Sequence, residues 1–240
     1  MPARRSIYNR LAASISDIPR WVETRSLLLS GEGEIFGVDE TAGKLSFIVC
    51  SSTKKLICLV GFPNQKAVEQ AVAYIGEESE IIAAPESSNY ITQVLPNWRS
   101  QLAWLHTLSH AQNLPKVPPG KVRLLSVDEI GNLKHLPTDL QTELAIASDS
   151  SPIATTIADG LPVSFCYTAQ TETLWDISIE TLAEHRNRGY AALCVAYMVE
   201  YMHQKGKQPV WGAEESNLPS MKLAAKLGFV PVDRLILLHQ

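Results

Sequence analysis

The sequence lacks several features that mark whole classes of protein. Its four cysteines show no CxxC spacing, and each lies in an apolar run, where cysteine usually behaves as a small hydrophobe. No apolar run approaches the roughly 20 residues that span a bilayer. The basic N-terminus is not followed by the apolar core of a signal peptide, although a transit peptide is an alternative interpretation. We therefore expect no membrane segment and a reduced, cytoplasmic compartment.

Excess positive charge is also absent. Lys and Arg number 21 against 25 Asp and Glu, which gives a net charge of −4 and does not point to nucleic acid or an anionic membrane as a partner. There is neither a GxxxxGK loop nor a complete GxGxxG motif. What the chain does contain is 45% hydrophobic residues, enough for a real core. Because the net charge is negative, any site that binds an anion must depend on a few neighbouring residues rather than on the charge of the whole chain.

Proline placement predicts two domains. The segment 111–121 concentrates prolines, which neither continue a helix nor fit a central strand. We place a boundary there and predict an N-terminal α/β lobe over residues 1–115 and a second domain over residues 119–240. The first lobe carries no recognisable reactive cluster and is expected to be scaffold or a substrate-recognition lobe.

Periodicity and turn signals give the expected elements of the first lobe. These are a helix over 18–29 with Asp17 as its N-cap, strands over 33–38, 44–50 and 56–61 with the last two as a hairpin, a helix capped by Asn64, a strand over 81–84, a helix over 90–95 and a strand over 102–108. The alternation of strands and helices predicts an α/β arrangement.

The second domain is expected to have a mixed sheet of the α+β kind. Its elements are a strand over 122–126, a helical region over 127–147, strands over 152–157 and 163–167 joined by an Asp159-Gly160 hairpin turn, a strand over 174–182, a helix ending near Gly206, a strand over 208–213, a helix over 218–227 capped by Asn217 and a final strand over 229–238.

The stretch from Leu174 to His203 predicts a strand, a tight turn and a helix start. The turn carries Arg186-x-x-Gly189-x-Ala191. A glycine there allows close approach of the backbone to a ligand, and the first N–H groups of the helix have no partner within the helix. Such a turn suits a phosphate group.

The order of elements and motifs resembles the GNAT superfamily of acyl-CoA-dependent N-acyltransferases over about the last half of the chain. The matching segments are the Arg186 to Ala191 turn, Asn217-Leu-Pro-Ser220 and Lys226-Leu-Gly-Phe229. The resemblance implies a GNAT-like acyl-CoA-binding C-terminal domain. It also implies that the N-terminal α/β lobe is a GNAT-like or related half that has lost its cofactor turn, as in two-lobed members.

The resemblance also implies the parts of the cofactor site. Backbone amides of the turn would hold the CoA pyrophosphate, and the end of the preceding strand would bond the pantetheine arm because its partner strand at Val210 splays away. The implied cofactor-binding residues are Ile179, Thr181, Leu182, Arg186, Asn187, Arg188, Gly189, Tyr190, Ala191, Asn217 and Ser220. Many members carry a tyrosine where this chain has Ala224, so either Tyr190, Ser220 or water protonates the leaving thiolate in its place, or the enzyme relies on positioning alone.

Acyl transfer to an amine also needs a base. Asp176 and Glu180 project to the same face of the predicted strand and are our candidates for the general base, directly or through water. Glu214 and Glu215 compete with them, and each carboxylate has an ordinary structural or solvated alternative.

Other reactive residue types have structural interpretations. His106 and His110 are four apart but have no third ligand nearby, so we expect no metal site there. His185 faces phosphate or solvent, and Cys194 belongs to a helix core rather than acting as a nucleophile.

The sequence therefore predicts a cytoplasmic enzyme that transfers an acetyl group from acetyl-CoA directly to a primary amine of a small molecule or peptide, without a metal. The alternatives are a CoA-binding sensor or structural module without catalysis, which Ala224 favours, and an unrelated nucleotide-binding protein. The acceptor and the oligomeric state are not encoded in any motif.

Overall fold

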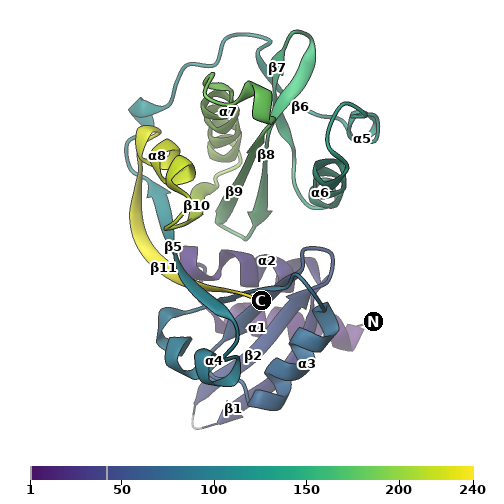
Figure 1. Cartoon of the computed structure of the whole chain (residues 1–240), viewed down its shortest axis with the longest axis vertical. Coiled ribbons are helices and arrows are strands. Elements are labelled where there is room, and N and C mark those ends of the chain that lie inside the picture. Colours follow the sequence, from purple (N-terminus) through teal and green to yellow (C-terminus); the bar gives the residue numbers. More distant parts are fainter. Residues whose placement is uncertain (1, 42) are drawn as a thin grey trace. The chain divides into compact units, whose positions relative to one another are not determined.

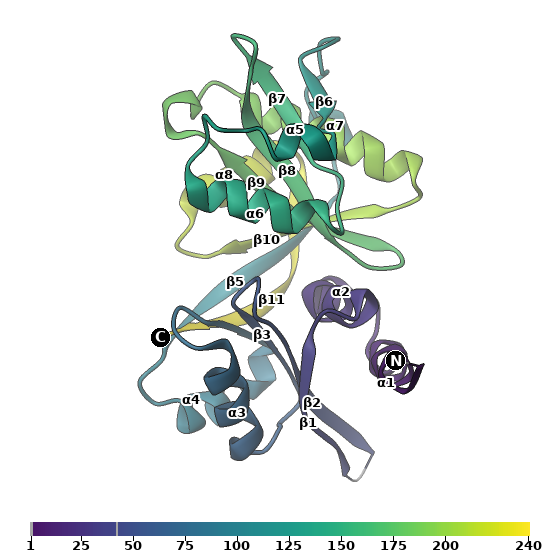
Figure 2. The same ribbon diagram turned by 90° about the vertical axis from the view of Figure 1, so that its right-hand side faces the viewer.

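The computed structural model describes residues 2–41 and 43–240 (Figures 1 and 2). Ala42, in the predicted turn after the first strand, lies outside them. Contacts divide the chain into two compact units, one made of Met1–Leu105, Ala213–Leu218 and Val232–Gln240, the other of His106–Gly212 and Pro219–Pro231. Both units are mixed α/β, which confirms the predicted fold class. The predicted domain limits, 1–115 and 119–240, stay a prediction.

The first unit contains a mixed sheet. Its elements are α1 (Pro2–Ser14), η1 (Pro19–Trp21), α2 (Val22–Ser30), β1 (Glu34–Thr41), β2 (Lys44–Ser51), β3 (Leu56–Val60), α3 (Gln65–Ile75), β4 (Glu80–Ala83), η2 (Pro85–Ser87), α4 (Ser88–Val94) and most of β5 (Arg99–Leu108) and β11 (Phe229–His239). Its strands run in the order β1-β2-β3-β4-β11. Only the β3–β4 pair is parallel among the pairs in that order, and α3 makes the crossover.

Both faces of this sheet are covered, as Figure 2 shows, because its strands are apolar at every position of β3 and at most of β2. Phe47 and Val49 pack with α1 and α2, whereas Ile48 and Cys50 pack with α3 and α4. Alternate side chains of a strand point to opposite faces, so a continuous apolar run can fill two cores at once.

The second unit repeats the same plan. Its elements are η3 (Ala111–Asn113), β6 (Val122–Leu124), α5 (Val127–Ile130), α6 (Thr138–Ser148), β7 (Ala154–Ala158), β8 (Leu161–Gln170), β9 (Leu174–Thr181), η4 (Ala183–His185), α7 (Tyr190–Gln204), most of β10 (Gln208–Glu214) and α8 (Leu218–Lys226). The strand order is β10-β9-β8-β7-β6. Here β9 and β10 form the parallel pair and α7 makes the crossover (Figure 1).

Most predicted elements of the second unit are confirmed. Asp159 and Gly160 both have positive φ, 51° and 80°, which is the backbone of a two-residue hairpin turn between β7 and β8. The helical region predicted over 127–147 contains two helices, α5 and α6, because Pro137 precedes α6 and separates it from the short α5. The strand predicted over 122–126 ends at Leu124, and Ser126 instead caps α5, in a capping box with Glu129.

Two predictions for the first unit need correction. The helix predicted over 18–29 is a turn of 3-10 helix, η1, followed by α2. Asp17 does not cap it. The Asp17 carboxylate lies 3.7 Å from Nε of Arg25, which is buried and bonds carbonyls near the end of α1. The helix α1 itself was not predicted.

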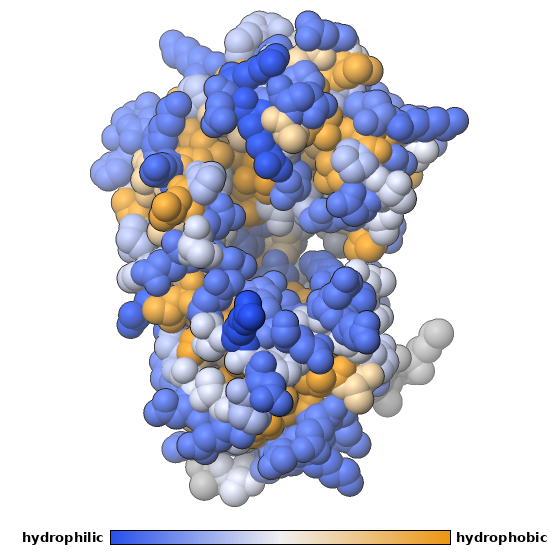
Figure 3. All heavy atoms as spheres, in the orientation of Figure 1, coloured by the Kyte–Doolittle hydropathy of each residue, from blue (hydrophilic) through white to orange (hydrophobic). Residues whose placement is uncertain are grey.

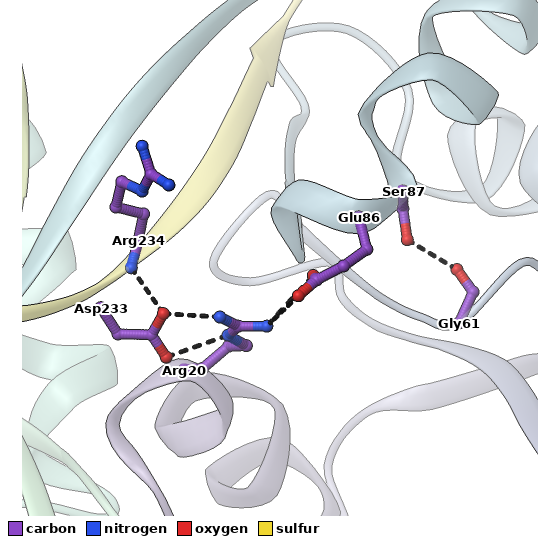
Figure 4. A network of polar contacts seen from close by, with 6 residues as sticks. All are labelled: Arg20, Gly61, Glu86, Ser87, Asp233 and Arg234. Atoms are coloured by element: carbon purple, nitrogen blue, oxygen red, sulfur yellow. Dashed lines mark hydrogen bonds and ion pairs between the residues drawn. The ribbon is translucent and has the colours of Figure 1, made fainter.

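Arg20 ties three separate segments of the first unit together (Figure 4). Its guanidinium donates to both carboxylate oxygens of Asp233 in β11, at 3.0 and 2.6 Å, and to Glu86 in η2, at 2.9 Å. Burial alone would raise the pKa of Asp233, but the bonds from Arg20 and the Arg234 N–H outweigh it and lower that pKa. The Glu86 pKa is lowered by its own backbone N–H and by Arg20.

We expect Arg20→Ala to lower the free energy of unfolding by about 1–2 kcal/mol at neutral pH, because charge-assisted bonds to a half-buried carboxylate are lost. Both carboxyl pKa values are lower in the folded state, so their contribution is present above their unfolded pKa values and is lost as the pH falls through the folded ones. Urea unfolding of both proteins at pH 7 and pH 3 measures this. The difference should shrink at pH 3, and Arg10→Ala, on the exposed face of α1, should change little at either pH.

The face in Figure 3 is mostly hydrophilic, with hydrophobic residues in small groups. Every helix within residues 2–41 and 43–240 is too short or too polar to cross a membrane. The large apolar side chains that are exposed include Phe62, Val127 and Leu218.

Candidate functional site

The strands β9 and β10 separate after a short parallel ladder. Their register runs from Gln208 opposite Leu174 to Val210 opposite Asp176 and stops there, although β9 continues to Thr181 and β10 to Glu214. On its other edge, β9 pairs with β8 from Trp175 to Thr181. Within the described residues, the edge of β9 from residue 177 to 181 therefore has no ladder partner from β10.

An aspartate lies where the two strands separate. The Asp176 carboxylate accepts a hydrogen bond from the Gly212 N–H at 3.2 Å, so a side chain replaces the next rung of the ladder. The predicted base Asp176 thus has a structural contact that fixes where the strands diverge. Ile179, predicted to contact the pantetheine arm, and Thr181 both lie beyond this point on β9.

The turn after β9 is built from a 3-10 turn and two residues with positive φ. After η4, Asn187 and Gly189 have φ values of 60° and 82°, and α7 begins at Tyr190. Gly189 is the N-cap of α7, and no side chain caps the helix. The first N–H groups of α7, from Tyr190 and Ala191 onward, therefore keep their capacity to bind an anion.

The equivalent helix of the first unit is built differently. The Asn64 side chain accepts a hydrogen bond from the Ala67 N–H at 3.0 Å, so the N-terminus of α3 is capped by the chain itself. The β3–β4 ladder extends from Leu56 opposite Glu80 to Leu59 opposite Ala83, which uses every residue of β4. At α3 and the β3–β4 pair, the first unit therefore has neither the open helix end nor the separated strands found at α7 and the β9–β10 pair.

Cationic groups surround the turn at α7, but not all of them point to it. Arg188 is exposed, whereas the Arg186 Nε donates to the Thr181 carbonyl at 3.1 Å and folds back along β9. Lys121, which the sequence did not single out, lies with its ammonium 5.0 Å from the ring centroid of Tyr190. His185 lies beside the same ring, and its buried Nδ1 has no hydrogen-bond partner in the described part of the chain.

Asn217 and Ser220 lie at the start of α8. The Asn217 N–H donates to the Glu214 carbonyl, so the residue sits in the turn that follows β10. Ser220 accepts a hydrogen bond from the indole N–H of Trp211 at 2.9 Å. Ala224, at the position of the usual tyrosine, is fully buried in α8. That position therefore offers no hydroxyl group to a leaving thiolate.

Glu180 projects into a pocket of about 330 Å³ between β9 and α6. The pocket also takes in Thr181, Leu182 and Arg186 from the predicted cofactor site. Although Glu180 is an exposed residue overall, desolvation by the pocket walls raises the pKa of its carboxyl group, and the charge of Glu143 raises it further, while Arg186 opposes the shift. A carboxyl group whose pKa moves towards neutrality is better suited to proton transfer.

The competing carboxylates lie in the first unit. Glu214 ends β10, with its carboxylate 3.7 Å from Nε2 of His239, and Glu215 is exposed in the following turn. Glu80, Glu214 and His239 each place one ligand atom within 4.8 Å of the others, which is the donor set that a divalent cation uses. His239 also contacts Gln101 at 2.9 Å, so this cluster already has an internal hydrogen bond.

The remaining candidates have structural roles. His106 is buried in β5 and bonds the Trp211 carbonyl, whereas His110 is exposed, so the two do not share a helix face. Cys194 is fully buried in α7, where burial raises the pKa of its thiol to about 12. Its assignment to the core is confirmed.

Comparisons with known proteins agree with this geometry. A family model described as GNAT acetyltransferase matches residues 156–237. No curated relative matches the sequence. A GCN5-related N-acetyltransferase-like protein from Streptococcus suis is 18% identical, with a TM-score of 0.71 over 100% of this chain and 99% of that chain.

Two further solved structures share the fold. A putative GNAT-family acetyltransferase from Novosphingobium aromaticivorans is 15% identical, with a TM-score of 0.61 over 93% of this chain and 96% of that chain. A tandem GNAT protein from the clavulanic acid biosynthesis pathway is 14% identical, with a TM-score of 0.59 over 91% of this chain and 87% of that chain. At these identities the likeness concerns the fold. The family match runs from β7 to β11 and includes the open turn between β9 and α7, so this part of the chain is similar to the GNAT acetyltransferase family.

Proposed function

We propose that this protein transfers an acetyl group from acetyl-CoA directly to a primary amine. The single observation that carries the proposal is the contrast between the two helix starts. The N-terminus of α7 is open behind Gly189, whereas Asn64 closes that of α3. An open helix N-terminus at the end of a parted strand pair offers both an anion site and an unpaired strand edge.

The groups around that turn fit a pyrophosphate. The N–H groups of Tyr190 and Ala191 would bind its oxygens, and Arg188 and Lys121 would add positive charge. The strand edge from Ile179 to Leu182 would bond the pantetheine amides in the manner of an added strand, with Asn217 and Ser220 of the α8 start as further contacts. Asn187 shapes the turn through its positive φ.

The chemistry requires few protein groups. Acetyl-CoA supplies an activated acyl carbon, and the protein must hold an amine beside it and accept a proton. Glu180 is the better candidate for that base, because it faces the pocket next to the turn. Asp176 accepts the Gly212 N–H, so its carboxylate is committed to the fold. The departing thiolate takes its proton from Tyr190, Ser220 or water, because the methyl side chain of Ala224 has no acidic proton.

Ala224 also supports a second candidate function, a CoA-binding module without catalysis. The same turn and strand edge would then bind CoA as a signal. The two functions differ in turnover and not in binding.

Calorimetric titration of the full chain with acetyl-CoA tests both, followed by mass spectrometry of a panel of primary amines incubated with the protein. We expect binding that ATP competes for only weakly, because ATP has no pantetheine arm for the β9 edge, and we expect one or more acetylated amines. Binding without any product would favour the second function. Absence of binding would contradict both, and equal competition by ATP would favour a general nucleotide site.

A further inference from the structure

The pocket in front of Glu180 has an unusual lining for its size. α6 contributes Asp139 and Glu143, and the end of β9 contributes Glu180. Leu140 and Leu182, both nearly buried, add apolar surface to the same lining. A pocket that combines carboxylates with aliphatic surface is complementary to a cation on an aliphatic chain.

The charge balance of the pocket is negative. Arg186 is the basic residue among its lining residues, and its Nε already donates to the Thr181 carbonyl. Three carboxylates therefore face one guanidinium. The carboxylates also repel each other. Desolvation has the largest effect on the pKa of Glu180, and the negative charges of Glu143 and Asp139 raise that pKa further. A cationic ligand would relieve this repulsion.

A buried tyrosine fixes one of the three carboxylates. The phenol of Tyr167, in β8, donates a hydrogen bond to Oε1 of Glu143, and Tyr167 is 8% exposed. Burial and the Glu143 carboxylate raise the pKa of Tyr167, so it stays a donor. Tyr167 lies opposite Ser178 in the β8–β9 ladder, on the same face as Glu180. Glu143 is therefore held at the pocket with its second oxygen still able to accept.

These observations divide the carboxylates between two tasks. An amine that attacks a thioester must be neutral, so the carboxylate that takes its proton is not the one that binds a lasting positive charge. Glu180 adjoins the proposed acetyl-CoA site and suits the first task. Glu143, on α6 and held by Tyr167, suits the second.

We propose that the acceptor is an aliphatic amine with a second cationic group, a diamine or polyamine, and that Glu143 binds the second cation. This rests on the proposed acetyl transfer. Glu180 takes the ammonium proton of the reacting nitrogen, the neutral nitrogen forms a bond to the acyl carbon, and the bond from that carbon to sulfur breaks, with the electron pair leaving on sulfur. The second proton that the nitrogen loses goes to the departing thiolate, through Tyr190, Ser220 or water. The second ammonium keeps its proton throughout.

The test compares two acceptors of equal chain length, 1,5-diaminopentane and pentylamine, at pH 7.5. We expect the intact chain to acetylate the diamine with at least about tenfold higher kcat/KM, since an ammonium held by a carboxylate in a partly exposed pocket gives about this discrimination. The preference should decline as salt is raised from 0.05 to 0.5 M.

Glu143→Gln should reduce the ratio of the two kcat/KM values to about 1–2, mainly by raising KM for the diamine. Tyr167→Phe should lower the ratio less, because the carboxylate remains but is no longer fixed. Glu200→Gln, an exposed glutamate on α7 away from the pocket, should keep the intact ratio. A ratio that Glu143→Gln leaves unchanged would overturn the proposal.

Failure of this proposal can be told apart from failure of the proposed function. If acetyl-CoA binds and pentylamine is acetylated as well as the diamine, the acceptor proposal is wrong and acetyl transfer stands. If neither amine reacts, calorimetric titration of the CoA-bound protein with diaminopentane decides. Undetectable binding at millimolar diamine overturns the proposal, and binding that Glu143→Gln abolishes supports it.

Discussion

Gly189→Glu is expected to abolish acetyl-CoA binding, with a loss of affinity of at least about a hundredfold. A Cβ at Gly189 would meet no atom of the described chain within 4 Å, so the space in front of this residue is open to a ligand. A carboxylate placed there meets the pyrophosphate as a like charge near the helix N-terminus, and one such pair at about 4 Å costs several kcal/mol at the effective dielectric constant of a protein surface. Calorimetric titration with acetyl-CoA measures the loss.

Gly206 provides a matched control at the other end of α7. It also has a positive φ, 69°, and a Cβ added there would likewise meet no atom of the described chain within 4 Å, so Gly206→Glu introduces the same charge and the same backbone strain of roughly 1 kcal/mol. Both variants should lose thermal stability, Gly206→Glu somewhat more because its carboxylate lies at the negative end of the helix dipole, but only Gly189→Glu should lose acetyl-CoA. Equal affinity in the two variants would contradict the placement of the pyrophosphate at this turn.

Glu180→Gln is expected to lower kcat for amine acetylation by about 10²–10⁴-fold while acetyl-CoA binding is retained, because a positioned base contributes this much to proton transfer. Glutamine keeps the size of the side chain and removes only its basicity. Steady-state kinetics with saturating acetyl-CoA, together with calorimetric titration of the cofactor, separate the two effects.

The pH profile identifies which carboxylate is the base. In the intact protein the rate should fall on the acid side with a midpoint above the ordinary pKa of a glutamate, since desolvation and Glu143 raise the pKa of Glu180. Removing the like charge with Glu143→Gln should move that midpoint to lower pH. Glu214→Gln should leave the acid limb in place, and loss of the limb in Glu214→Gln rather than Glu180→Gln would move the base to β10.

Asp176 illustrates what the sequence could and could not predict. Alternation along the strand correctly places Asp176 and Glu180 on one face, because the period of a strand is a local property. The separate roles of the two carboxylates depend on Gly212 and on α6, which are distant in sequence. The predicted separation of β9 from β10 came from the family resemblance, and the ladder that ends at Asp176 agrees with it.

Elements with strong local signals were predicted well. The Asp159-Gly160 turn and the Asn64 cap each depend on neighbouring residues, and both have the expected geometry. The helix α1 was missed because charged and polar residues between its apolar positions make the segment polar overall, so that its helical period is weak in the sequence. The positions that the fold buries there are Tyr8, Leu11 and Ala12, followed by Ile15 just after the helix.

Glu143 and Tyr167 were not candidates from the sequence because neither belongs to a motif. A surface glutamate on a helix and a tyrosine in an apolar strand are ordinary residues in isolation. Their pairing depends on α6 packing over β8, and Arg186 lies against β9 through its bond to the Thr181 carbonyl rather than free in the turn. Long-range packing therefore determines the proposed acceptor side of the site, whereas local backbone determines the proposed cofactor side.

The burial of every cysteine makes a continuous activity assay possible. All four thiols are buried, and burial raises the pKa of each, to about 12 for Cys50 and Cys194. A thiol-reactive chromophore attacks thiolates, so it should label the folded protein very slowly while it reacts at once with free CoA. Each acetyl transfer liberates one CoA thiol, and the colour that develops would report turnover with little background from the protein itself.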